Sequence, residues 1–440
     1  MGTKLPPTAA IAVAMTVAFA SHGAAQAPFS RGASEFVRDE IHVGINIGNT
    51  LDVPSGNETE WGNPPITRDL IRAYRAKGFD TVRVPVTWSK RFDHDAPGHA
   101  IEPAFLARVK EVVGWCLDEG FVTILNTHHD SGGDGMPFGW ITIDGEHEAE
   151  STEMLRDLWT QIATALRDAG ERLVFEVFNE PRKTKWWGGP DGSQKGQDDW
   201  TGRKPYYEAC NRYAKAFAEA VRATGGNNAR RYLMVPTYAA AFQESTCAGW
   251  ASPEPDGDRI IADIHCYEPG DFCLWGNRKI HDPAHAEKRL GLFFPLFKKY
   301  FTDKGIPLVL GEVNAQRRWL DDLHYSPNDA ERMRWARQYA EKARSFGFRL
   351  SSGKTAVTGT WALSTGAPRS RLSPCSRTPS SLPGIVASTT RHSASGWTRP
   401  RRPPRRRRQP PIRATSFCAG PSATPRTTVA AGGSPWATAM

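Results

Sequence analysis

The C-terminal segment of this sequence lacks acidic residues altogether. Residues 351–440 contain 14 Lys and Arg but no Asp or Glu, whereas residues 1–350 contain 42 basic and 47 acidic residues, a net charge of −5. The net charge of +9 for the whole chain therefore arises in the C-terminal segment. A mildly acidic body excludes charge-driven binding of nucleic acid as its main activity, so we expect no nucleic-acid partner.

Cysteine is also scarce. Five of the seven cysteines precede residue 351, and they are Cys116, Cys210, Cys247, Cys266 and Cys273. They form no Cys-x-x-Cys pair, so the sequence gives no sign of a metal, and we expect no cofactor. At least one thiol must stay free because five is odd. Cys247 and Cys273 are a plausible disulfide, and Cys116, on the apolar face of a helix, is expected to be a small buried hydrophobe.

Long apolar runs are absent except at the N-terminus. There, Ala9–Ala20 follows Lys4 and precedes Ala25-Gln26-Ala27, the order of a basic region, an apolar region and an A-x-A cleavage site. The run is short for a membrane span. We therefore predict a signal peptide over residues 1–27, a secreted (extracellular or periplasmic) protein and no membrane association after cleavage. An uncleaved membrane anchor is the alternative.

From residue 42 onward, short apolar runs alternate with segments of helical period. The runs are apolar on both faces, as buried parallel strands are, and they are Val43–Gly48, Thr81–Val86, Phe121–Asn126, Leu173–Phe178, Tyr232–Pro236, Ile260–Ile264 and Pro307–Leu310. This alternation predicts an α/β fold, a TIM (β/α)8 barrel, with one unit unaccounted for. A doubly wound sheet is the alternative, but Gly44–Gly48 lacks the glycine spacing of a dinucleotide-binding loop.

Polar side chains lie within or just after five of these runs. They include Arg83, His128, His129, Asn179, Glu180, His265, Tyr267 and Glu312. In a barrel, the C-terminal strand ends meet at one rim, where catalytic groups gather. Two glutamates at this rim need polar partners, because an unpaired buried charge is costly. Two carboxylates that face each other across a cleft are also the groups that hydrolyse glycosidic bonds.

Six segments together resemble the glycoside hydrolase family 5 endoglucanases, and most of all the bacterial subfamily 4 cellulases. They are Gly44–Asp52, Glu60–Pro64, Val82–Trp88, His128–Asp130, Phe178–Arg182 and Leu310–Glu312. The resemblance covers about residues 36–350. It implies a (β/α)8 barrel that cleaves internal β-1,4-glucosidic bonds of cellulose or related β-glucans with retained anomeric configuration. We expect a monomer whose partner is the polysaccharide substrate.

The same resemblance implies roles for the rim residues. Glu180 would be the general acid/base, and Glu312 the nucleophile. Asn179 would hold the 2-hydroxyl of the reacting sugar. Arg83 and Tyr267 would hydrogen-bond the nucleophile and keep it ionised.

Further residues are expected to line the substrate cleft. The resemblance implies that His128 and His265 border the reacting subsite, with His129 as an additional candidate. Aromatic faces pack against the apolar faces of pyranose rings, so tryptophans near rim loops are candidate sugar platforms. Trp61 and Trp275 are the preferred candidates, and ordinary packing is the alternative for each. The other tryptophans near rim loops are Trp88, Trp140 and Trp187.

The resemblance stops near Leu350. The eighth strand of the family normally ends in Trp followed by Asp or Glu, Asn and Gly, but Arg349–Gly359 contains no Trp. We predict that the eighth β/α unit is missing or scrambled by a frameshift, because a shifted reading of Ser351–Gly359 allows the missing motif. Residues 28–350 would then be the catalytic domain and residues 351–440 a disordered basic tail. The rival interpretation is a genuine Pro-rich tail, including Arg401–Arg408, that binds an anionic surface.

Three hypotheses for function follow. The first is an endo-β-1,4-glucanase, with xyloglucan, mixed-linkage glucan, mannan and xylan as alternative substrates. The second is a catalytically dead product, because loss of strand eight would leave open sheet edges. The third is a secreted binding module that acts through the basic tail.

Overall fold

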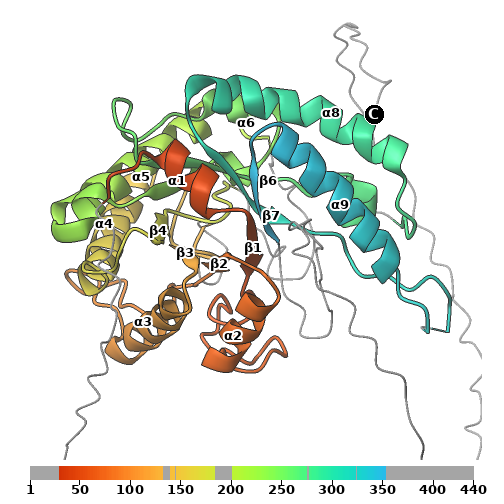
Figure 1. The fold of residues 1–440 in the computed structure, drawn as a ribbon. Helices are drawn as coiled ribbons and strands as arrows, with labels where there is room; N and C mark the ends of the chain where they lie inside the picture. Colours follow the sequence, from red (N-terminus) through yellow and green to blue (C-terminus); the bar gives the residue numbers. More distant parts are fainter. Residues whose placement is uncertain are drawn as a thin grey trace, which may run out of the picture. The chain divides into compact units, whose positions relative to one another are not determined.

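A closed barrel of eight parallel strands, in the order β1 to β8, forms the framework of the molecule (Figure 1). The computed structural model describes residues 29–131, 139–143, 145–183, 201–274, 277–323 and 325–352. The strands are β1 (Val43–Asn46), β2 (Thr81–Val84), β3 (Val122–Asn126), β4 (Leu173–Glu176), β5 (Leu233–Pro236), β6 (Ile260–His265), β7 (Leu308–Val313) and β8 (Arg349–Ser352). The seven predicted strands and the TIM barrel are therefore confirmed.

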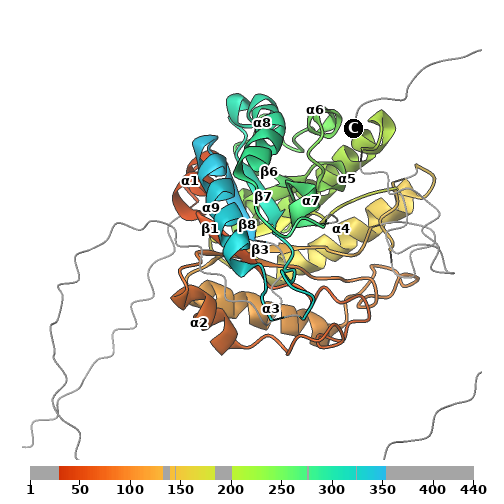
Figure 2. The same cartoon turned by 90° about the vertical axis from the view of Figure 1, so that its right-hand side faces the viewer.

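Helices pack around the outside and the ends of the barrel, as Figures 1 and 2 show from two directions. They are α1 (Ala33–Glu40), α2 (Arg68–Ala76), α3 (Pro103–Asp118), α4 (Glu148–Ala165), α5 (Lys204–Ala223), α6 (Glu244–Gly249), α7 (Gly270–Cys273), α8 (Pro283–Tyr300) and α9 (Asp329–Ser345), with 3₁₀ turns at Gly226–Arg230, Tyr238–Ala240 and Thr302–Lys304. Proline in the first turn of α3, α5 and α8 suits a position whose N–H has no helical partner. No helix within the described ranges is both long and apolar enough to cross a bilayer.

The N-terminal end of the barrel is closed by α1. Phe36 and Val37 of this helix belong to one buried cluster with residues near the strand starts, among them Tyr232. The rings of Phe36 and Tyr232 stack with centroids 4.1 Å apart. Truncating a fully buried Phe costs about 3–5 kcal/mol, so this contact is a substantial part of the barrel's stability. Closure at this end leaves the opposite rim for a site.

Strand eight is present, which corrects the expectation that the barrel lacks it, whereas any helix completing the eighth β/α unit falls outside the described residues. Arg349–Ser352 pairs with β1, where Gly44 lies opposite Ser351, and with β7, where Leu310 lies opposite Leu350. The prediction failed because four residues suffice to close the ladder and two of them are serines, which carry no strand signal. The edges of β1 and β7 are covered, so the expected open edges do not exist. Residues from 353 onward lie outside the described part, and the frameshift stays a prediction.

The five cysteines of the body are buried free thiols. Cys116 is fully buried on α3, which confirms its expected packing role. The suggested disulfide between Cys247 and Cys273 is wrong, because both are free thiols; they pack as small hydrophobes in one cluster with Phe272 and Leu290. The predicted signal peptide lies outside the described residues.

Candidate active site

The two predicted catalytic glutamates lie at the C-terminal rim. Glu312 is in β7, and Glu180 follows β4. Both line a cleft of about 760 Å³, together with five other predicted residues: His128, His129, Asn179, His265 and Tyr267. The cleft therefore brings together residues from four of the five strand ends that the sequence analysis singled out.

Each oxygen of the Glu312 carboxylate accepts a hydrogen bond. Arg83 Nη1 donates to Oε1 at 2.8 Å, and the Tyr267 hydroxyl donates to Oε2 at 2.5 Å. Burial beside Glu312 raises the pKa of Tyr267 well above its usual range, so the phenol stays protonated and remains a donor. Two donors on one carboxylate stabilise its charge and fix the direction of both oxygens. The predicted contacts of Arg83 and Tyr267 with the nucleophile candidate are present.

Arg83 is itself held by a second buried glutamate. Its Nε and Nη2 donate to Glu176 at 2.7 and 2.6 Å, and both side chains are fully buried. Nη1 also donates to Asn46 Oδ1, and Nη2 donates to Asn179 Oδ1 at 2.8 Å. With its carbonyl oxygen occupied, Asn179 offers its NH2 group to a ligand in the cleft. Burial raises the pKa of Glu176, although the charge of Arg83 opposes this shift.

His265 connects the two rim glutamates with another buried acid. Its Nδ1 lies 2.8 Å from Glu180 Oε1 and 3.9 Å from Glu312 Oε2, and its Nε2 lies 3.3 Å from Asp263 Oδ2. Burial lowers the pKa of this imidazole, but Glu312 and Asp263 outweigh burial and raise the pKa to about 10. The Nδ1–Glu180 contact is a hydrogen bond that helps to position Glu180, whereas Nε2 lies near Asp263 at ion-pair distance without a hydrogen bond.

The spacing of the two catalytic candidates is short. One oxygen of Glu180, one oxygen of Glu312 and one nitrogen of His265 all lie within 4.8 Å of one another. Inverting glycosidases separate their carboxyl groups by about 6.5–9.5 Å to admit a water, whereas retaining enzymes keep them about 5–5.5 Å apart. The nearest oxygens of the pair are therefore closer than the carboxyl separation of inverting enzymes.

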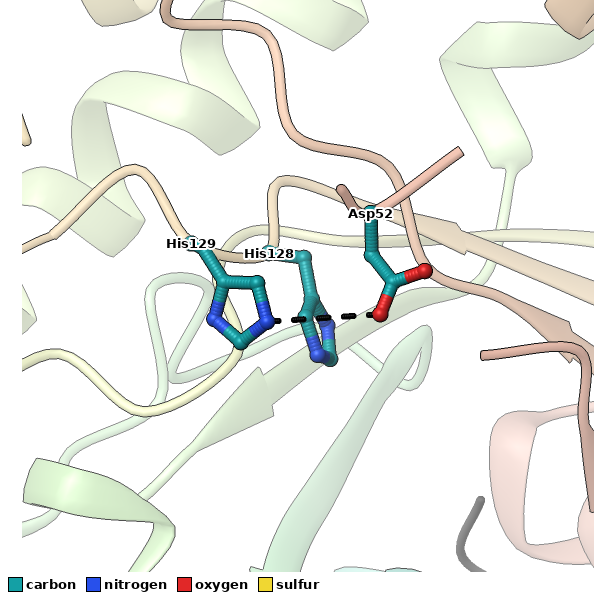
Figure 3. A group of neighbouring side chains, drawn as sticks. All are labelled: Asp52, His128 and His129. Atoms are coloured by element: carbon teal, nitrogen blue, oxygen red, sulfur yellow. Dashed lines mark ion pairs between the residues drawn. The ribbon is translucent and has the colours of Figure 1, made fainter. Parts of the chain in front are cut away.

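Asp52, His128 and His129 form a second cluster (Figure 3), in which His129 Nε2 and Asp52 Oδ2 form an ion pair at 4.0 Å. One potential ligand atom of each residue lies within 4.8 Å of the others, a spacing that could hold a metal ion. The hydrogen bonds of Asn126 decide whether His128 can be a ligand. Its Oδ1 accepts from the backbone N–H of Val86, so its NH2 group donates to His128 Nδ1 at 3.2 Å.

That contact fixes the tautomer of His128. Because Nδ1 is an acceptor, the ring proton is on Nε2, which lies 4.0 Å from Glu312 Oε1. A protonated nitrogen cannot ligate a metal. The geometry therefore favours His128 as a hydrogen-bond donor toward a ligand near Glu312.

The tryptophans divide into different environments. Trp88 is fully buried and donates from Nε1 to the Asn126 carbonyl, and Trp140 is buried and donates to Asp130. Both fulfil packing roles, so neither is a sugar platform. Trp61 is partly exposed and its ring meets that of His129 edge-on at 5.6 Å, which places it beside the cleft. Trp187 and Trp275 lie outside the described residues.

Sequence reasoning missed Glu176 and Asp263. Glu176 holds Arg83, and Asp263 contacts His265 and accepts from the Gly311 N–H at 2.8 Å. Each is an acid inside an otherwise apolar strand. That pattern was available as a signal, since a buried charge requires a partner or a function.

Three comparisons agree with this geometry. The family model described as cellulase (glycosyl hydrolase family 5) matches residues 46–351. Endoglucanase A of Ruminococcus albus is 34% identical over 317 residues, covering 70% of this chain and 79% of that protein. Endoglucanase A of Clostridium longisporum is 33% identical over 344 residues, covering 72% of this chain but only 60% of that protein.

Solved structures give the same result. A GH5-4 broad specificity endoglucanase from Clostridium acetobutylicum matches with a TM-score of 0.64 and 31% identity, covering 73% of this chain and 89% of that chain. A GH5 xyloglucan-specific endo-β-1,4-glucanase from a metagenomic library, in complex with cellotriose, matches with a TM-score of 0.62 and 32% identity, covering 72% and 88%.

Proposed function

This chain belongs to the cellulases of glycoside hydrolase family 5, subfamily 4, and we propose that it is an exported, retaining endo-β-1,4-glucanase. As a member of that family it is a glycosidase. The finer assignment rests on one observation above all, which is that one oxygen of Glu180 lies within 4.8 Å of one oxygen of Glu312. This spacing supports a double displacement.

In the first step, Glu312 attacks the anomeric carbon of the bound glucan. The carbon–oxygen bond to the leaving sugar breaks as the Glu312 ester forms, and Glu180 gives its proton to the departing oxygen. Asn179, with its NH2 group directed to the ligand, is placed to bind the 2-hydroxyl. Hydrogen bonds at that hydroxyl strengthen in the transition state.

In the second step, Glu180 removes a proton from water, which attacks the same carbon and releases Glu312. Two inversions at one carbon give net retention. Arg83 and Tyr267 donate to Glu312 at 2.8 and 2.5 Å, so they stabilise the carboxylate both before attack and as it leaves.

The substrate class is a β-1,4-glucan. The solved relatives are named as broad specificity endoglucanases and as a xyloglucan-specific endo-β-1,4-glucanase. We therefore place soluble cellulose first and xyloglucan second, with mixed-linkage glucan, mannan and xylan as further alternatives. The presence of β8 supports an active enzyme over a dead product, because the barrel that carries Glu180 and Glu312 is closed.

Export is proposed from the segment that ends at Ala25-Gln26-Ala27. A signal peptide brings the enzyme to a substrate too large to enter the cell. The N-terminal sequence of the protein recovered from the culture medium tests this, and we expect it to begin near Pro28. Retention of an intact N-terminus in the membrane fraction would contradict export.

Reducing-sugar release from carboxymethylcellulose and from xyloglucan tests the activity. We expect release by the purified chain, and none by Glu312→Ala or Glu180→Gln. Glu171→Gln is a matched control, because Glu171 is a buried glutamate that precedes β4 and pairs with Arg31, away from the rim. Activity that persists in Glu312→Ala, or release from neither polymer by the soluble wild type, would contradict the proposal.

A further inference from the structure

Exposed apolar side chains gather on one segment beside the cleft. Seven large hydrophobic residues are exposed in the described part of the chain, and four of them lie between β7 and α9: Trp319, Leu320, Leu323 and Tyr325. Tyr325 is 82% exposed and Leu323 is 74% exposed. Such a concentration is unusual for a soluble surface, where exposed apolar residues are normally scattered. It indicates a binding surface.

The segment is held in a fixed shape. Trp319 and Pro327 form an antiparallel bridge, and the Leu320 N–H donates to the Ser326 carbonyl at 2.7 Å. The Asp321 carboxylate accepts from the backbone N–H groups of Leu323, Tyr325 and Ser326 at 3.0, 3.1 and 2.7 Å. A surface that is ordered before binding loses little entropy when a ligand arrives.

The segment is continuous with the wall of the cleft. Asn314 and Gln316, which precede it, line the cleft together with Leu274. The Gln316 N–H donates to the Cys273 carbonyl at 3.0 Å, and Arg318 Nη2 donates to the Leu274 carbonyl at 3.1 Å. Figure 1 shows the connection from β7 projecting beyond the N-terminal end of α9. The segment therefore begins within three residues of the cleft lining.

We propose that Trp319, Leu323 and Tyr325 form an outer glucan-binding platform that holds the polysaccharide beyond the catalytic cleft. The inference rests on the proposed function, since it takes the substrate to be a long β-glucan. Flat aromatic side chains suit the apolar faces of pyranose rings. The Arg317 guanidinium lies over one face of the Trp319 ring, 5.4 Å from its centroid. A short substrate that fills only the reacting subsites would not reach this platform.

The double variant Trp319→Ala/Tyr325→Ala tests the platform. We expect KM for carboxymethylcellulose and xyloglucan to rise by roughly five- to fifty-fold, as loss of two aromatic contacts predicts. We expect kcat/KM for an aryl β-cellobioside to stay within about two-fold, because the catalytic contacts remain. Leu292→Ala is the matched control, since Leu292 is an exposed apolar residue on α8, and it should change neither value.

A binding measurement separates this proposal from the function on which it rests. In an inactive Glu180→Gln background, native electrophoresis through gels containing hydroxyethylcellulose should retard the protein, and the double variant should migrate faster. If the wild type hydrolyses nothing but this difference remains, the proposed function fails and the platform stands.

Three outcomes would overturn the platform. The first is an unchanged KM and unchanged retardation in the double variant. The second is an equal loss of activity on polymer and cellobioside, which would assign the segment to support of the catalytic frame. The third is concentration-dependent self-association of the wild type that disappears in the variant without a change in polymer KM, which would assign the surface to a second copy of the chain.

Discussion

Arg83 and Glu176 form a fully buried ion pair with two hydrogen bonds, 2.7 Å from Nε and 2.6 Å from Nη2. The same guanidinium donates to Glu312 at 2.8 Å. Arg83 therefore divides its positive charge between Glu176 and the proposed nucleophile, Glu312. We infer that the pair orients Glu312 while Glu176 limits how much of the Arg83 charge reaches it.

Replacing Glu176 with Gln should lower kcat while leaving KM nearly unchanged. The amide accepts only one of the two hydrogen bonds, so Arg83 is free to shift toward Glu312. A hydrogen bond to a charged group contributes about 1.5–3 kcal/mol, which predicts a decrease in kcat of roughly 10- to 100-fold. The acidic limb of the pH–rate profile should move to lower pH, because Glu312 gains a larger share of the positive charge.

Steady-state kinetics from pH 4 to pH 9 measure both effects. Glu171→Gln should keep the acidic limb of the pH–rate profile at its wild-type position, because Glu171 is far from the rim and pairs with Arg31. A purely structural role for Glu176 would lower the yield of folded enzyme without moving the limb, and that result would contradict the shared-charge account.

His265 should make stability depend on alkaline pH. Its pKa in the folded protein is about 10, above the usual value near 6.5 in an unfolded chain. The folded state therefore binds the proton more tightly, so this contribution is complete below about pH 6.5 and disappears as pH rises through about 10. We expect the free energy of unfolding to fall by a few kcal/mol, to order of magnitude, between pH 7 and pH 10.

Urea unfolding at pH 7 and pH 10 checks this, and His265→Gln should flatten the difference. His281→Gln is the control, because burial lowers the pKa of His281 and the residue does not titrate in that window. An equal alkaline loss in wild type and His265→Gln would refute the assignment.

Barrel closure depends on the absence of a side chain at Gly44. A Cβ added there would lie 2.9 Å from Ser351 Oγ and 3.1 Å from Ser351 Cα, so Gly44→Ala should push β8 away from β1. Such overpacking costs about 1–3 kcal/mol, and we expect a lower Tm by calorimetry. Gly291→Ala in α8 meets nothing within 4 Å and should hold or raise the Tm. An unchanged Tm for Gly44→Ala would contradict the close packing of β8 against β1 at Gly44.

The sequence predicted the fold well where periodicity was strong. Apolar runs with β-branched residues identified β1 to β7, and the polar residues at their ends identified the cleft. Strand β8 was missed because Ser351 has little strand preference, while its fit depends on Gly44, which is more than 300 residues away in sequence. A pattern of neighbouring residues cannot reveal a contact between two positions so far apart in the sequence.

The site was predicted through its motifs and not through its buried supports. Glu312 and Glu180 stand in recognisable segments, whereas Glu176 and Asp263 act only through partners on other strands. Trp88 resembled a sugar platform in sequence, but its indole is buried against the third strand. Which face of a loop residue meets solvent depends on tertiary packing.

Covalent trapping tests the central claim most directly. In a 2-deoxy-2-fluoro aryl β-cellobioside with a good leaving group, the fluorine slows both steps and the activated aryl group speeds only the first. The glycosyl-enzyme should therefore accumulate on a retaining enzyme. Intact mass spectrometry should show one added fluorocellobiosyl group, and peptide mapping should place it on Glu312. Hydrolysis of the unmodified substrate without any labelled Glu312, or a label on another residue, would contradict the account.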